Sequence, residues 1–269
     1  MEPLVVICPQ IEENPRLSAV LTQALAGRTH RRVSRPEQLH TLQGCRVLFA
    51  VSLLHGGVNL TWYAMLSAIR QDPQLLEGCR GAVLVDGDSE LYTKSAAREL
   101  VFAANQAGCA FMGAPLVEAT GSLANFQIRA MLRHTDCPTA YAACAAELVE
   151  RLMTDVPPVR QHPHLLVLHA SNRKTSNTIA LWERMAPRLA GRADTQVVSL
   201  RNGTVADCNG CEFRTCLHFG EEGRCFYGGV IVEQVYPAIQ HADGVLWLCP
   251  NYNDALAANL TACINRLTA

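Results

Sequence analysis

Strand-like and helix-like segments alternate along the first half of the chain. Five segments are typical of strands, four of them strongly apolar, and they fall at residues 4–8, 30–34, 45–52, 81–85 and 109–117. Between and after them, apolar side chains recur at spacings of three and four. This spacing predicts helices around residues 15–26, 60–69, 95–106 and 138–153. The alternation predicts an α/β domain, over residues 1–153, with a parallel sheet covered by helices on both faces.

The same alternation restarts after a proline-containing segment, residues 154–163, which we interpret as a linker. Strands are expected from Leu165, at residues 195–200 and at residues 244–249, with helices from Thr178, at residues 230–241 and from about Leu256. The triplet Asn-Leu-Thr follows the third strand in both halves. The sequence thus predicts a second doubly wound domain over residues 164–269. With three strands only, we expect this domain to be truncated, or completed by a partner subunit.

The segment from Leu165 to Thr178 combines a buried strand, a polar loop and the start of a helix. The free N–H groups and the positive dipole end of such a helix suit a phosphate. Hydroxyl, amide and guanidinium groups add donors, and the candidates are Ser171, Arg173, Ser176, Asn177 and Thr178. An ordinary capped helix start is the alternative, because Ser, Asn and Thr also cap helices.

Residues 170–178 resemble the phosphate loop of the NADPH-dependent FMN reductases and iron–sulfur flavoproteins, a branch of the flavodoxin-like fold. That loop typically reads Gly-Ser-x-Arg-x-x-Ser-Asn-Thr, and here Ala170 and Thr175 replace the usual glycines. The resemblance implies that the second domain binds FMN, and it extends to the first domain only at the level of the fold. Together with the strand count and the repeated Asn-Leu-Thr triplet, we expect two tandem flavodoxin-like domains.

The loop after the expected strand 244–249 should face the same crevice, because ligands bind at the carboxyl ends of the strands that flank the switch point. In the resembling family this loop reads Ser-Pro-x-Tyr and lies along the isoalloxazine ring. Here Cys249 replaces the serine, and the implied cofactor contacts are Pro250, Asn251, Tyr252 and Asn253. An ordinary turn is the alternative.

Four cysteines lie close together on what reads as a polar loop, at Cys208, Cys211, Cys216 and Cys225. Thiolates at such spacing suit a 4Fe-4S cluster or a tetrahedral zinc ion. The iron–sulfur flavoproteins carry a compact cysteine motif here, usually with two residues between the second and third cysteines, whereas this chain has four. Cluster, zinc and metal-free thiols all remain open.

The corresponding loop of the first domain, residues 9–14, carries Glu12 and Glu13 and lacks the hydroxyl cluster. Carboxylates there repel a phosphate, so we infer that this domain has lost FMN binding. Its acidic segment Asp86-Gly87-Asp88-Ser89-Glu90 reads as a solvated turn, with a cation site as the alternative.

Composition limits the class of protein. The chain is 49% hydrophobic and 17% charged, which is typical of a globular protein. Its net charge of −1 gives no sign of the basic surface that binds nucleic acid or an anionic membrane. No signal peptide or membrane span is apparent, so we expect a cytoplasmic protein. Twelve cysteines in a reducing compartment would be buried thiols, metal ligands or redox groups rather than disulfides.

These features together predict an FMN-dependent oxidoreductase that moves electrons from NAD(P)H to a small-molecule or protein acceptor, in a homo-oligomer. No catalytic acid or base is evident. The alternative is a non-catalytic flavodoxin-like binding or assembly protein with a vestigial flavin site.

Overall fold

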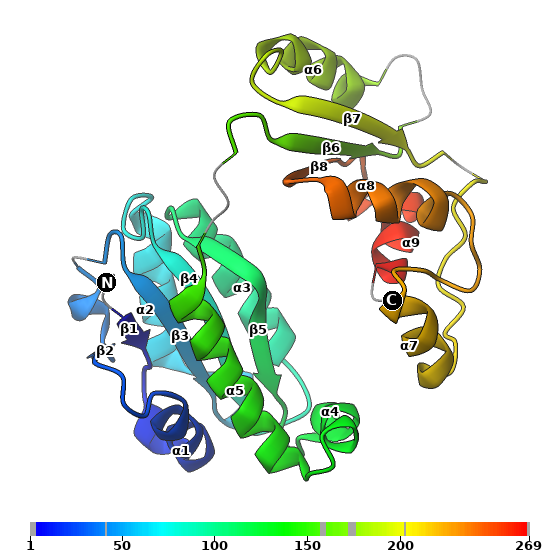
Figure 1. Cartoon of the computed structure of the whole chain (residues 1–269). Coiled ribbons are helices and arrows are strands. Elements are labelled where there is room, and N and C mark those ends of the chain that lie inside the picture. Colours follow the sequence, from blue (N-terminus) through cyan, green and yellow to red (C-terminus); the bar gives the residue numbers. More distant parts are fainter. Residues whose placement is uncertain (1–3, 41, 157–159, 172–175, 202, 268–269) are drawn as a thin grey trace. The chain divides into compact units, whose positions relative to one another are not determined.

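The computed structural model describes residues 4–40, 42–156, 160–171, 176–201 and 203–267 (Figure 1). The chain forms two compact units, Met1–Pro157 and Pro158–Ala269. Each unit is an α/β structure built on its own parallel sheet, and each is described separately below. The predicted fold class, parallel sheets with flanking helices, is confirmed.

The sheet of the first unit has five strands in the order β2-β1-β3-β4-β5, and all neighbours are parallel. This order reverses direction at the β1/β3 boundary, which is the switch point of the flavodoxin-like doubly wound fold. The strands are β1 (Leu4–Ile7), β2 (His30–Val33), β3 (Arg46–Leu53), β4 (Arg80–Gly87) and β5 (Ala110–Ala119).

Helices cover both faces of this sheet because its central strands are apolar on both faces. Val6 packs into one core with α1 and α5, whereas its neighbour Val5 packs into another with α2 and α3. The helices are α1 (Pro15–Ala24), α2 (Leu60–Gln71), α3 (Thr93–Gln106), the short α4 (Gln127–Leu132) and α5 (Cys137–Thr154). Only α4 has no counterpart among the helices expected from periodicity.

The sheet of the second unit has three parallel strands in the order β7-β6-β8, with β6 in the centre. One face packs Leu166 and Leu168 against the helices that follow β7 and β8, and the other packs Val167 against Trp182 of α6. The elements are β6 (His164–His169), α6 (Asn177–Met185), β7 (Asp194–Ser199), α7 (Phe213–Glu221), the π-helical turn η6 (Ile231–Val235), α8 (Tyr236–His241), β8 (Gly244–Leu248) and α9 (Ala258–Arg266).

Two segments of the second unit were misread as loops. Phe213, Cys216 and Leu217 place apolar groups three and four residues apart, and this part of the cysteine-rich segment is the helix α7. The segment after β8 forms a short hairpin of β9 (Asn251–Tyr252) and β10 (Ala255–Leu256).

The order β7-β6-β8 corresponds to the order β2-β1-β3 of the first unit. In the first unit the other side of β3 pairs with β4 over eight residues, and Val47–Leu53 are buried. Within the described residues nothing pairs with the equivalent side of β8, and Val245 is 36% exposed. No helix in the described ranges is long and apolar enough to cross a membrane.

Candidate functional site

The two expected cofactor loops of the second unit leave the sheet side by side. β6 and β8 are parallel neighbours, and His169 at the end of β6 lies opposite Leu248 at the end of β8. Ala170 and Ser171 therefore begin one loop next to the point where Cys249 and Pro250 begin the other. This is the switch point of the β7-β6-β8 order, where open α/β sheets bind ligands.

The start of α6 presents hydrogen-bond donors at the carboxyl end of the sheet. Ser176 is the N-cap, and its hydroxyl accepts a hydrogen bond from the N–H of Ile179 at 3.3 Å. The N–H groups of Asn177 and Thr178 have no acceptor within the described part of the chain, as helical geometry requires of a first turn. These two N–H groups and the helix dipole make this end of α6 suitable for a phosphate. The expected contact Arg173 lies outside the described residues.

The loop after β8 is built as a tight hairpin. β9 and β10 pair antiparallel, with Tyr252 opposite Ala255, and the turn residues Asn253 and Asp254 have φ angles of 52° and 59°. Positive φ at both central positions is the type I′ turn, which Asn and Asp tolerate best after glycine. The hairpin leaves Tyr252 53% exposed, so its ring is free to stack on a planar ligand.

Asn259 begins the Asn-Leu-Thr triplet of the second half, and the structure gives it a specific role. Its side-chain amide donates to the carbonyl of Leu200 at 2.7 Å, which ties the start of α9 to the end of β7. In the first unit, Asn59 donates to the carbonyl of Ser52 at 2.8 Å and also caps α2. Both asparagines hold a helix start against the carboxyl end of a strand, although not the equivalent strand.

His169 lies at the candidate site but is not among the residues that the sequence predicts there. Its Nδ1 is buried without a hydrogen-bond partner among the described residues. Burial lowers the pKa of the imidazole, nearby Arg201 lowers it further, and a hydrogen bond with the backbone of Ser171 opposes both. A neutral histidine therefore lies directly before the candidate phosphate loop. The only sequence signal was a polar residue ending an apolar strand.

The four cysteines of the expected metal motif occupy different structural environments. Cys208 is exposed, whereas Cys216 lies on α7 and Cys225 packs against the core around Ile231. Cys216 and Cys225 both lie close enough to Tyr236 for their charges to raise the pKa of its phenol, although burial is the larger cause.

These cysteines do not fit a metal site as the structure arranges them. No group of three or more His, Cys, Asp or Glu residues within the described ranges is placed to hold a metal ion. The end of the cysteine-rich segment is held against α9 by Arg266, which is 4% exposed and donates to the carbonyl of Gly228 at 2.7 Å. We therefore derive no chemistry through a cluster or zinc.

The corresponding end of the first unit is filled by its own side chains. β4 runs through Asp86, so the expected acidic turn begins later, and Asp86 is fully buried. The guanidinium of Arg16 donates to both carboxylate oxygens, at 2.7 and 3.1 Å, and Asn14 donates to one of them at 2.9 Å. The hydroxyl of Tyr141 donates to the other at 2.9 Å.

Arg16 also closes this end of the sheet over the loop after β5, through hydrogen bonds to the carbonyls of Thr120 and Gly121. Burial and the charge of Asp86 raise the pKa of the Tyr141 phenol, so it stays a hydrogen-bond donor. Asp86 is thus a buried acceptor saturated by this chain's own donors, and the interpretation of Asp86 as part of a solvated turn or cation site was wrong.

Comparison with known proteins identifies one part of the chain. Neither the curated proteins nor the solved structures contain a match. Residues 163–269, which include β6, the start of α6 and the β9–β10 hairpin, match the family model of the NADPH-dependent FMN reductases. The resemblance expected from the loop sequences is therefore confirmed over this second unit, which is similar to the NADPH-dependent FMN reductases.

Proposed function

We propose that the second unit binds FMN at the carboxyl ends of β6 and β8, and that the protein is an NAD(P)H-dependent flavin oxidoreductase. The observation that carries this proposal is the adjacency of two loops. His169 lies opposite Leu248, so the loop that leads to the donor-rich start of α6 and the hairpin with Tyr252 both begin at the carboxyl end of the sheet. The family match covers both loops.

The roles of the residues follow from their chemistry. The N–H groups of Asn177 and Thr178, together with Ser171, Ser176 and Arg173, would hold the phosphate. The hairpin would hold the ring system through Tyr252 and the backbone of Pro250, Asn251 and Asn253. FMN, when bound, supplies the redox chemistry: it accepts a hydride from a nicotinamide and passes electrons to a small-molecule or protein acceptor. The protein's task is to orient the ring and limit its exposure to water.

The first unit is proposed to have no flavin of its own. Its equivalent edge is occupied by Arg16 and Asp86, and the loop before α1 carries Glu12 and Glu13 in place of hydroxyl donors. A phosphate there would meet carboxylates and a guanidinium whose donors are already engaged. We propose one flavin per chain.

Reduction under anaerobic conditions tests the oxidoreductase proposal. The protein is reconstituted with FMN, freed of excess cofactor and mixed with NADPH or NADH. Loss of the visible flavin absorbance on mixing, followed by its return when an acceptor is added, is the expected result. Tightly bound FMN that neither nucleotide reduces would contradict the proposal and would favour a non-catalytic binding or assembly protein.

We also propose that the protein self-associates along β8. The residues of β8 are apolar, and within the described residues no strand pairs with the backbone groups on the side of β8 that faces away from β6. Unpaired strand edges beside apolar surface are normally covered. Light scattering should find a dimer or larger assembly that Val245→Lys dissociates, whereas Leu181→Lys, on the exposed face of α6, should not. A monomeric parent protein would contradict this proposal.

A further inference from the structure

β7 is the outer strand of the second unit's sheet on the side opposite β8, and it presents a row of backbone groups in a defined register. The N–H of Asp194 donates to the carbonyl of Pro163 at 3.0 Å, and the N–H of Leu200 donates to the carbonyl of His169 at 2.8 Å. Alternate residues of a parallel strand bond to the same neighbour, so residues 194, 196, 198 and 200 face β6. Thr195, Val197 and Ser199 therefore point their N–H and C=O groups outward. Within the described residues no strand pairs with this edge.

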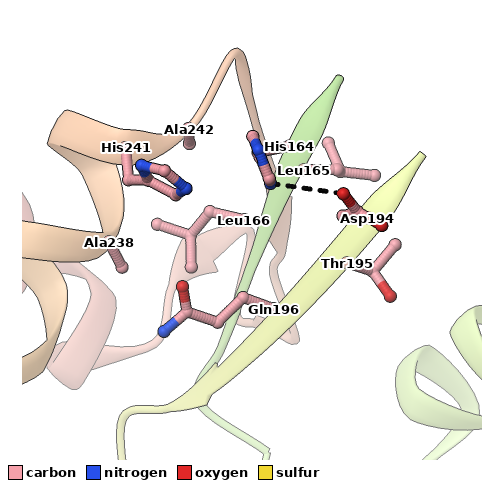
Figure 2. Close-up of a pocket in the computed structure, with 9 residues that line it drawn as sticks. All are labelled: His164, Leu165, Leu166, Asp194, Thr195, Gln196, Ala238, His241 and Ala242. Carbon is pink, nitrogen blue, oxygen red and sulfur yellow. Dashed lines mark ion pairs between the residues drawn. The ribbon is translucent and has the colours of Figure 1, made fainter. Parts of the chain in front are cut away.

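A groove runs beside this edge, between β7 and the helical segment formed by η6 and α8. Gln196, Val197 and Val198 line one wall of a hollow of about 450 Å³, and Glu233, Pro237 and His241 line the other. A smaller cavity of about 90 Å³ continues it toward the start of the strands and shares Gln196 and His241. Figure 2 shows Gln196 and Leu166 at this smaller cavity, with Ala238 and His241 reaching in from α8. We call the two hollows together the β7 groove.

Two carboxylates line the β7 groove. Asp194 and Glu233 contribute carboxylates, and among the residues that line the two hollows there is no lysine or arginine. The histidines His164 and His241 lie together at one end, with ring centroids 4.4 Å apart. His164 Nδ1 is 3.7 Å from the carboxylate of Asp194, the contact drawn in Figure 2. The side chain of Asp194 is 70% exposed and remains open to another cation.

We propose that the β7 groove binds an extended, basic peptide segment as an added strand. The outward N–H and C=O groups of Thr195, Val197 and Ser199 would pair with its backbone, as in other cases of strand addition to a sheet edge. Alternate side chains of the peptide would enter the groove beside Gln196, and lysine or arginine side chains would meet Asp194 and Glu233. The six residues of β7 span about 20 Å, enough for a peptide of similar length.

Fluorescence anisotropy of a labelled peptide tests this proposal with the full chain. The probe is acetyl-Val-Lys-Val-Lys-Val-Lys, and its counterpart has glutamate at each lysine. The lysine peptide should bind, more weakly at high salt, and the glutamate peptide should not. Val197→Pro removes one outward N–H and leaves the ladder to β6 intact, because proline is tolerated at such edge positions. It should weaken binding about tenfold, whereas Val197→Thr, which keeps the N–H, should not.

A second variant tests the role of the acidic side chains and leaves the backbone of β7 unchanged. Glu233→Lys changes an exposed side chain of η6, and it should weaken binding of the lysine peptide and improve binding of the glutamate peptide. Failure of the parent protein to bind the lysine peptide, or equal binding by the Pro and Thr variants at position 197, would overturn the proposal. An assembly of the parent chain that Val197→Pro dissociates would also overturn it, by showing that a second copy occupies the edge.

Discussion

The guanidinium of Arg16 holds the buried carboxylate of Asp86 through two hydrogen bonds at the carboxyl end of the first unit's sheet. The Asp86 side chain is 1% exposed and that of Arg16 is 31% exposed. A carboxylate so deep in the protein is tolerated because a cation and two neutral donors surround it. This pair lies where a flavodoxin-like sheet would bind its ligand, so it explains why the first unit is proposed to act as a scaffold.

Removal of Arg16 should destabilise the first unit strongly. Arg16→Met keeps much of the apolar stem but leaves Asp86 buried without its cation, and we expect a loss of at least about 2 kcal/mol in the free energy of unfolding by urea. Arg70→Met is the matched control, since Arg70 pairs with Glu99 at 2.7 Å on the exposed surface. It should cost less than about 1 kcal/mol. Equal losses for the two variants would show that the buried pair has no special role.

Ser176 should serve both the helix and the phosphate, and two substitutions separate these roles. Ser176→Thr keeps the cap and the hydroxyl, so stability and FMN affinity should stay near those of the parent. Ser176→Asp keeps the cap to Ile179 but places a negative charge at the phosphate position. It should remain folded and bind FMN at least about tenfold more weakly. Parental FMN affinity in the Asp variant would place the phosphate elsewhere.

His169 should make the second unit less stable in acid. Its pKa in the folded protein lies below the ordinary value near 6.5, so the unfolded chain binds more protons between the two values. The contribution of the neutral ring is complete above that ordinary value and is lost as the pH falls toward the folded pKa. His169→Gln should flatten this part of the stability profile measured by chemical unfolding. A stability profile in the His169 variant that matches that of the parent protein would contradict the assignment.

The cysteines should differ in their reactivity toward iodoacetamide, read by peptide mass spectrometry. Cys208 is exposed and should react first. Cys249 is also exposed, but partial desolvation raises its pKa, so less thiolate is present and it should react more slowly. Six buried thiols should react only after unfolding, and they are Cys8, Cys45, Cys79, Cys109, Cys144 and Cys263. Joint protection of Cys208, Cys211, Cys216 and Cys225, relieved by a chelator, would instead reveal a metal site formed by these four.

The sequence pattern predicted β3 and β4 from long apolar runs, and in both strands every residue after the first is buried. Asp86 was misread because acidic residues beside glycine are typical of turns, and its partner Arg16 lies 70 residues away. A local pattern carries no record of a contact at that separation.

The residues of the candidate site also fall into two groups, those that belong to local motifs and those whose role depends on distant contacts. Ser176 and Tyr252 could be predicted as cofactor contacts because they belong to local motifs with a fixed spacing. His169 and Asn259 are not predicted by the sequence because their roles depend on neighbouring strands: His169 Nδ1 is buried at the carboxyl end of the central strand β6, and Asn259 bonds to Leu200. α7 was missed because four cysteines and nearby glycines outweighed its short apolar stripe.

Equilibrium titration with FMN, followed by quenching of flavin fluorescence, tests the central proposal most directly. We expect saturation at one FMN per chain. Arg173→Ala should weaken binding about ten- to a hundredfold, since a hydrogen bond from a charged group to phosphate is lost. Arg16→Met, which changes the first unit, should keep the parental affinity in the second. No saturable FMN binding by the parent chain, or two FMN bound per chain, would contradict the account.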